Sequence, residues 1–144
     1  MSNPEREGRF MVAVGAMIEH VPTGKVLLLK RANTAGYLPG IWEDIMGRMK
    51  QFEGPVQALR REVMEEAGLE IEVLEPINVM HDYRGERTAE NELVGIVYRC
   101  RTHSDRVVLS HEHSAHVWVS PEEALQMVEH SGARMDILAF MKSL

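Results

Sequence analysis

One helix-forming segment, residues 47–69, constrains the fold of this chain more than any other. Its sequence is GRMKQFEGPVQALRREVMEEAGL. Proline suits the first position of a helix and glycine suits the left-handed residue just past its end, so Pro55 and Gly68 predict a helix over residues 55–67. At roughly 100° per residue, the apolar side chains that fall on one stripe of this helix are Val56, Leu59, Val63 and Ala67. That stripe must face a hydrophobic core.

Three glutamates, Glu62, Glu65 and Glu66, fan out beside the apolar stripe. Neighbouring like charges on a helix cost about 0.2–0.5 kcal/mol per pair, and Glu62 has Glu66 rather than a lysine at the fourth position along. Carboxylate oxygens are the ligands that Mg²⁺ prefers, so a bound cation would remove the repulsion. The alternative is a charged surface helix in which Arg61 pairs with Glu65. Arg61 can also hold a carboxylate through two parallel hydrogen bonds, with Glu53 and Glu62 as candidates.

The spacing of these charges resembles the Nudix box over its whole length. The segment reads as the pattern GX5EX7REVXEEXGL, and weaker resemblance extends through LLLKR before it and HVWVSPEEAL after it. Two places depart from the usual pattern. Ile45 and Met46 stand where members commonly carry Pro-Gly, and Phe52 stands where a glycine is usual. Neither change removes an acidic group.

The resemblance implies a hydrolase that cleaves a diphosphate linkage in a nucleoside diphosphate derivative or a nucleoside triphosphate. The implied cofactor is Mg²⁺ or Mn²⁺. The implied metal ligands are Glu62, Glu65, Glu66 and the backbone carbonyl of Met46.

Further roles follow from the same resemblance. Glu62 is the favoured catalytic base and Glu112 is its rival, because many members place a glutamate in the loop before a tryptophan-bearing strand, here the strand of Trp118. Arg61, with a part in catalysis, and Glu53 would fix the helix and the preceding loop. Gly47 would let the backbone approach the metal and the phosphate closely, and Gly68 would end the helix.

The remaining periodicity predicts a mixed sheet. β-prone apolar runs cover residues 10–18, 25–30, 70–81 and 92–102, with shorter candidates at 48–50 and 107–109. Pro76 indicates a bulge or an edge position in the third run. A capping sequence at Ser120 opens a helix to about residue 130, Ser131-Gly132 breaks it, and residues 135–141 form a last helical turn or two. We predict an α/β fold, an α/β/α Nudix-like sandwich in a single domain over residues 1–144, with residues 1–8 as a flexible tail.

Loops supply further candidates for substrate binding. Arg31 and Tyr37 fall in a predicted loop over residues 31–41, where a phosphate or a base could meet them. Arg48 falls in a predicted short strand that enters the loop before the helix, on a side that could face a phosphate. The cluster His111, His113 and His116 raises the possibility of zinc. Alternating histidines entering a strand point to opposite faces, which disfavours a shared metal.

Composition limits the partners. The net charge of −6 argues against a nucleic-acid surface and favours a small, metal-bound phosphorylated substrate such as a nucleotide. One cysteine, no signal-like N-terminus and no run long enough to cross a bilayer predict a cytoplasmic protein without a membrane partner. Self-association as a homodimer is compatible with the resemblance.

Three other functions fit parts of the sequence. A nucleotide-binding or sensor module would share the fold without catalysis, but it would more naturally have lost acidic residues of the box. A structural cation site would give metal-linked stability without turnover. A prenyl diphosphate isomerase would need a catalytic cysteine in a loop, whereas Cys100 falls in a predicted strand.

Overall fold

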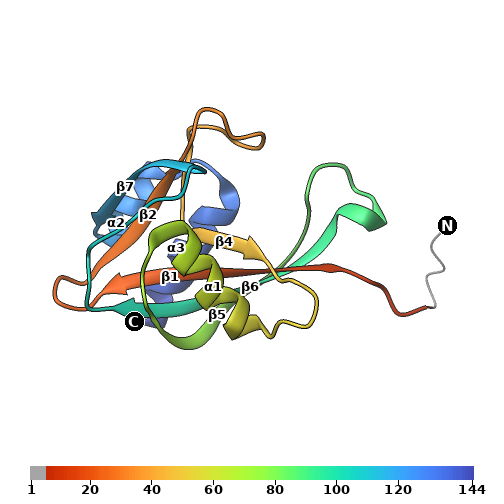
Figure 1. Ribbon diagram of the computed structural model, residues 1–144, viewed down its shortest axis with the longest axis horizontal. Coiled ribbons are helices and arrows are strands. Elements are labelled where there is room, and N and C mark those ends of the chain that lie inside the picture. The colour runs from red at the N-terminus through yellow and green to blue at the C-terminus, as the bar shows by residue number, and fades with distance from the viewer. Residues whose placement is uncertain (1–5) are drawn as a thin grey trace.

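Seven strands and three α-helices make up the regular structure of residues 6–144, the part of the chain that the computed structural model describes (Figure 1). The strands are β1 (Met11–His20), β2 (Lys25–Arg31), β3 (Trp42–Glu43), β4 (Ile45–Arg48), β5 (Glu72–Tyr83), β6 (Glu92–Thr102) and β7 (His113–Val119). The helices are α1 (Pro55–Ala67), α2 (Pro121–Met127) and α3 (Ser131–Ser143), with a short 3-10 turn η1 (Ala89–Asn91). Most of the predicted flexible tail, residues 1–5, lies outside the described residues, and residues 6–8 are exposed.

Strand β1 organises the mixed sheet. It pairs with β6 in parallel along its whole length, from Met11↔Leu93 to His20↔Thr102. Its other edge is shared, because residues 13–16 pair with β4 and residues 19–20 pair with β2, both antiparallel. Strand β2 continues outward to β3 and β7. The sheet therefore splits between β4 and β2, and Asp44, the residue between β3 and β4, lies at the split.

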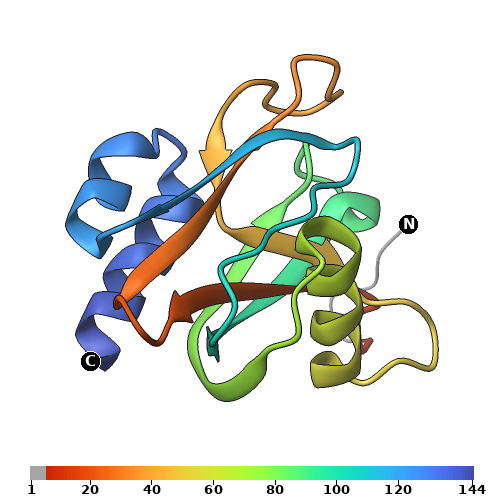
Figure 2. The same cartoon turned by 60° about the vertical axis from the view of Figure 1, so that its left-hand side comes forward.

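Alternating side chains of the central strands feed two separate cores. Val14, Ala16 and Ile18 of β1 pack in one cluster with the α1 residues Leu59 and Val63. Met17 of β1 and Leu28 of β2 face the other way, where they meet Ile137 and Phe140 of α3. Figure 2 shows α1 on one side of the strands and the two C-terminal helices on the other. This arrangement confirms the predicted α/β/α sandwich.

Helix α1 has the predicted bounds. Gly68 follows it in the left-handed conformation at φ 65°, and its N–H donates to the carbonyl of Met64. The predicted apolar stripe is right for Leu59, Val63 and Ala67, which are fully buried, but wrong for Val56, which is 38% exposed. Val56 lies in the first turn and does not join the core cluster, whereas Ala58 does.

Two predictions for the second half of the chain are wrong. Residues 131–132 begin helix α3 rather than only ending the one before, and α3 runs well beyond the predicted 135–141 because Ala133, Ile137 and Phe140 bury one continuous face. Residues 107–109 form no strand. Instead, the N–H of Val108 donates to the carbonyl of Ala67 and so satisfies the end of α1.

Strand β5 behaves as Pro76 predicted. Its pairing with β6 shifts register on both sides of that proline, and β5 lies at the edge of the sheet. None of the helices within residues 6–144 has the length and apolar character needed to cross a membrane.

Candidate active site

A pocket of about 530 Å³ opens beside the split in the sheet. Its walls come from α1, the 31–38 loop, the β3–β4 junction, the facing parts of β5 and β6, the loop before β7, and the start of α3. Segments far apart in the sequence thus meet around one cavity. The predicted site residues that line it are Arg31, Tyr37, Met46, Gly47, Arg48, Glu62, Glu66 and Glu112.

Arg61 lies behind the pocket and holds three of the four predicted acidic side chains of the box. It donates from Nε to Glu53 Oε2 at 2.6 Å and from Nη2 to Glu53 Oε1 at 2.8 Å, which is the two-pronged grip predicted from the sequence. Nη1 donates to Glu62 Oε1 at 2.8 Å and to Glu65 Oε2 at 3.3 Å. The hydrogen bonds from Arg61 and from the N–H of Lys50 lower the pKa of Glu53 to about 2.

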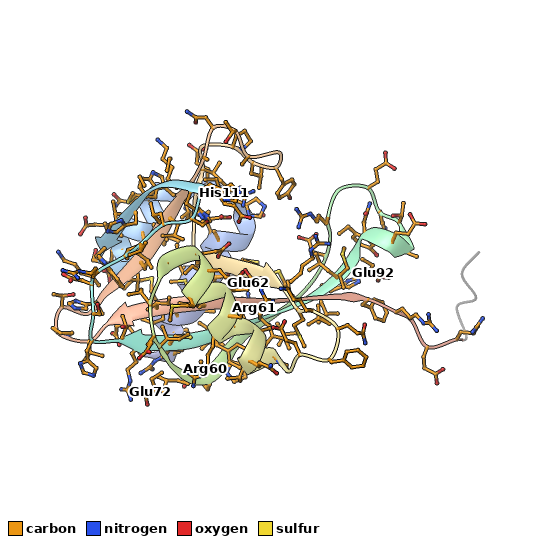
Figure 3. All side chains as sticks on the ribbon, in the orientation of Figure 1. Arg60, Arg61, Glu62, Glu72, Glu92 and His111 are labelled. Atoms are coloured by element: carbon orange, nitrogen blue, oxygen red, sulfur yellow. The ribbon has the colours of Figure 1, made fainter. Side chains whose placement is uncertain are left out.

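The Arg61 network joins α1 to the loop before it. Arg61 Nη2 also donates to the carbonyl of Arg48 at 3.2 Å. Figure 3 shows Arg61 and Glu62 side by side on α1, and His111 on the loop before β7. Glu65 does not line the pocket, and its side chain is 54% exposed. Arg61 therefore positions Glu62 at the pocket while it holds Glu65 outside.

Gly47 makes room for Glu62. A Cβ added at Gly47 would overlap the carboxyl group of Glu62 and would lie 2.5 Å from its Cγ. The Glu62 side chain itself therefore approaches the backbone of Gly47 closely and needs a glycine there. The sequence predicted this need only for a metal and a phosphate.

Glu66 is a buried acid in the pocket whose ionisation is opposed by its surroundings. It is only 7% exposed, and its Oε2 atom has no hydrogen-bond partner within residues 6–144. Burial, followed by the nearby charges of Glu62, Glu112 and Glu43, raises the pKa of Glu66 to about 9. The positive charge of Arg31 acts in the opposite direction but is outweighed, so an ionised Glu66 needs a further positive partner.

This pKa predicts how the stability of the metal-free protein depends on pH. The folded chain keeps a proton on Glu66 that the unfolded chain releases near its ordinary pKa of 4.5, so the free energy of unfolding falls as pH rises from there to about 9. Urea unfolding in a chelator, repeated across this range, measures the slope. Glu66→Gln should flatten it in part, since the buried Asp44 and Asp136 contribute in the same direction. A slope that Glu66→Gln leaves unchanged would contradict the assignment.

Glu43 is a pocket residue that sequence reasoning missed. Its Oε2 accepts from Arg31 Nη1 at 3.2 Å and lies 2.9 Å from Nε2 of the buried His113. Arg31 Nε donates to the carbonyl of Tyr37 at 2.7 Å, which fixes the 31–38 loop. The signal available in the sequence was an acidic pair, Glu43-Asp44, between the apolar residues around it.

The three histidines do not form a shared site. His113 is buried against Glu43, whereas His116 is exposed on the other face of β7, and His111 is exposed at the pocket. Across residues 6–144, no three His, Cys, Asp or Glu side chains already converge on a point that could hold a metal ion.

A second acidic group that the sequence did not reveal lies deeper in the pocket wall. Asp44 from the β3–β4 junction and Asp136 from α3 are 4% and 2% exposed, lie close enough for their charges to interact, and both line the pocket. Asp136 Oδ1 accepts from Asn78 Nδ2 at 3.1 Å, and Asp44 Oδ2 has no hydrogen-bond partner in the part of the chain that the structure describes. Burial and the charge of Asp136 raise the pKa of Asp44 well above its ordinary range.

The chain belongs to the Nudix family. The family model described as the NUDIX domain matches residues 9–137, which confirms the family predicted from the box. The fold is that of solved Nudix proteins. The MutT protein from Methanosarcina mazei Go1 superposes with a TM-score of 0.76 at 26% identity, covering 96% of this chain and 98% of that one.

Relatives of known activity include pyrophosphohydrolases. The chain is 34% identical over 118 residues to the CTP pyrophosphohydrolase of Escherichia coli strain K12, covering 82% of each chain. It is 29% identical over 107 residues to the nucleoside triphosphatase NudI of Escherichia coli strain K12 / DH10B, covering 69% of this chain and 76% of the relative. The chain is thus a member of the Nudix hydrolases with pyrophosphohydrolases among its relatives.

Proposed function

We propose that this protein is a Mg²⁺- or Mn²⁺-dependent pyrophosphohydrolase that cleaves the diphosphate linkage of a small nucleotide, with nucleoside triphosphates as the first candidates. The observation that carries the proposal is the buried, unpartnered carboxylate oxygen of Glu66 at the pocket, next to the Arg61-held Glu62. The printed activities of the two bacterial relatives support the substrate class.

The donor chemistry of the pocket fits a hard divalent cation. Glu66 and Glu62 offer carboxylate oxygens, and the backbone carbonyl of Met46 is a third candidate donor. Mg²⁺ keeps several waters and commonly takes only one or two protein carboxylates plus substrate phosphates, so a preassembled set of three side chains is not required. We keep Glu65 as a further candidate ligand, although its carboxylate is engaged by Arg61. When bound, the cation would neutralise phosphate oxygens and lower the pKa of water.

Other residues of the pocket are candidates for the catalytic base, for positioning and for substrate binding. Glu62 is held by Arg61, whereas Glu112 is exposed at the pocket and free of such a clamp, so Glu112 is now the better candidate to accept the proton of the attacking water. Arg61 and Glu53 position α1 against the preceding loop. Arg31 and Arg48 at the pocket are candidates for the phosphate chain, and Tyr37 for the base or the sugar.

One of the alternatives loses support. Cys100 is fully buried and its pKa is raised to about 12, mainly by burial, so it cannot serve as the catalytic cysteine of an isomerase. The burial of Glu66 at the pocket fits a bound cation with or without turnover, so turnover of a nucleotide is what separates the hydrolase from a sensor module and from a structural cation site. The lone buried cysteine and the charge of −6 fit our proposals of a cytoplasmic setting and a small nucleotide substrate. A homodimer also stays a proposal.

A nucleotide panel tests the proposed function. We expect pyrophosphate and a nucleoside monophosphate to appear from at least one nucleoside triphosphate in Mg²⁺ or Mn²⁺, and turnover to stop in a chelator. Product analysis by ion-exchange chromatography distinguishes this cleavage from release of a terminal phosphate. Binding without turnover of any nucleotide, including sugar- and dinucleoside-linked diphosphates, would favour the sensor module instead.

A further inference from the structure

A second cavity, of about 640 Å³, adjoins the candidate active site. Its walls come from the start of β1, the end of β4, the loop that follows β4 and one side chain of α1. Figure 1 shows this loop beside the first residues of β1, where the N–H of Met49 donates to the carbonyl of Val12 at 2.8 Å. Arg48 and Glu62 line both the main pocket and the second cavity. A ligand that extends past these two side chains therefore passes from one space into the other.

Phe52 stands in the wall of the second cavity in an unfavourable backbone conformation. Its φ of 68° lies in the left-handed region, where a bulky side chain is strained and glycine is not. The residue is 98% exposed, so burial does not offset that strain. The loop around it is fixed, because the N–H of Lys50 donates to Glu53 Oε1 at 2.8 Å and the N–H of Glu53 donates to the carbonyl of Lys50 at 3.2 Å. A strained residue that exposes an aromatic ring at a cavity indicates a binding role for that ring.

The other side chains of the second cavity define what it can bind. Phe10 adds a second aromatic ring, which is 47% exposed. Arg48 and Lys50 are exposed and positively charged. The two glutamates of the lining both accept hydrogen bonds from Arg61. Exposed aromatic rings beside cationic side chains suit a ligand in which a planar base is joined to phosphate groups.

We propose that the second cavity binds a second nucleoside, joined through the phosphate chain to the nucleoside in the main pocket. The favoured substrates are then dinucleoside polyphosphates, an assignment that rests on the proposed function and extends its substrate class. The phosphate chain would pass Arg48 and Glu62, and the second base would stack on Phe52. Hydrolysis adds a hydroxyl group to one phosphorus and a proton to the departing phosphate oxygen, so one water and one dinucleotide give two mononucleotides.

The experiment compares diadenosine tetraphosphate with ATP, which lacks the second nucleoside. We expect kcat/KM of the wild-type protein to be at least about tenfold higher for diadenosine tetraphosphate, because stacking of a base on an aromatic side chain strengthens binding by about 5-fold to 150-fold. Ion-exchange chromatography should show AMP with ATP, or ADP alone, as the first products. Dissociation constants of methylene-bridged analogues of the two nucleotides, measured by calorimetry, give the same comparison without turnover.

Substitutions of Phe52 locate the effect. Phe52→Gly removes the ring and suits the left-handed conformation, so the folded variant should lose about tenfold in the ratio of the two kcat/KM values, mainly through a higher KM for diadenosine tetraphosphate. Phe52→Trp keeps an aromatic face and should stay within about twofold of the wild-type ratio. Val108→Gly, the matched control, removes an exposed apolar side chain from a loop that lines neither cavity at that position, and should also keep the ratio.

A second variant covers the case in which thermal melting shows that Phe52→Gly is unfolded. Phe10→Ala removes the other ring of the cavity, and we expect it to lower the same ratio by at least about threefold.

The outcomes separate this inference from the proposed function. Turnover of ATP together with a wild-type ratio near one or below it overturns the second nucleoside site and leaves the hydrolase intact. A preference for diadenosine tetraphosphate that the folded Phe52 or Phe10 variant retains in full overturns the assignment to this cavity. Failure of every nucleotide to bind or react overturns the proposed function itself, and the second site with it.

Discussion

Replacing Glu66 by glutamine is expected to lower kcat/KM by at least about hundredfold in saturating Mg²⁺, while it makes the metal-free protein more stable near neutral pH. Substitution of a residue that only supports a metal ligand lowers metal affinity or activity by about 10–100-fold. Loss of a ligand itself should therefore lower activity at least as much. The gain in stability has a separate cause. Near neutral pH the folded chain must keep on Glu66 a proton that the unfolded chain has released, and glutamine removes this cost because it needs no proton.

A loss of activity together with a gain in stability would distinguish a metal-binding role of Glu66 from a packing role. Thermal melting with and without Mg²⁺ should show stabilisation of the wild type by the cation and little for Glu66→Gln. Glu70→Gln, at an exposed glutamate just beyond α1 that does not line the pocket, is the matched control and should change neither property. Full turnover by a folded Glu66→Gln variant would remove this residue from the metal site.

The box predicted the part of the site that is local in sequence. Helix bounds, the glycine that ends the helix, and the grip of Arg61 on Glu53 all depend on residues within one short segment, where spacing fixes geometry. The placement of Glu65 outside the pocket was not predictable from the same pattern. The position of Glu65 depends on which glutamates accept hydrogen bonds from Arg61, and the helical spacing alone does not determine these partners.

The second acidic centre depends on contacts between distant parts of the chain. Asp44 meets Asp136 only because one edge of β1 pairs first with β4 and then with β2, and because α3 packs on the face opposite α1. A sequence taken alone shows an aspartate beside a glutamate and another in a helix, both of which suit solvent equally well. Burial, which turns them into functional candidates, appears only when the layers are assembled.

The underestimate of α3 has a related origin. Ser131-Gly132 is a common helix ending, and local preference favoured a break there. The helix nevertheless begins at Ser131, since Ala133, Ile137 and Phe140 gain burial against the sheet and tertiary packing outweighs a weak local preference.

Gly47→Ala is expected to lower kcat/KM by at least about hundredfold while the fold persists. The added methyl group would occupy the space of the Glu62 carboxyl group, so that side chain must move away from its position beside Arg61. A displacement of about 1 Å in a catalytic arrangement can reduce the rate by about hundredfold. The overlapping atoms are the end of a flexible side chain, so the backbone pairing of Gly47 with Val14 can survive.

Activity and unfolding measured on the same preparation test this separation of effects. We expect the free energy of unfolding of Gly47→Ala to change by less than about 2 kcal/mol, because no core atom has to move. Gly54→Ala is the matched control within the same box, since a Cβ there meets no atom within 4 Å, and it should keep its activity. If Gly47→Ala turns over like the wild type, the exact position of Glu62 is not required for hydrolysis, and the acid chemistry must rest on Glu66 and Glu112.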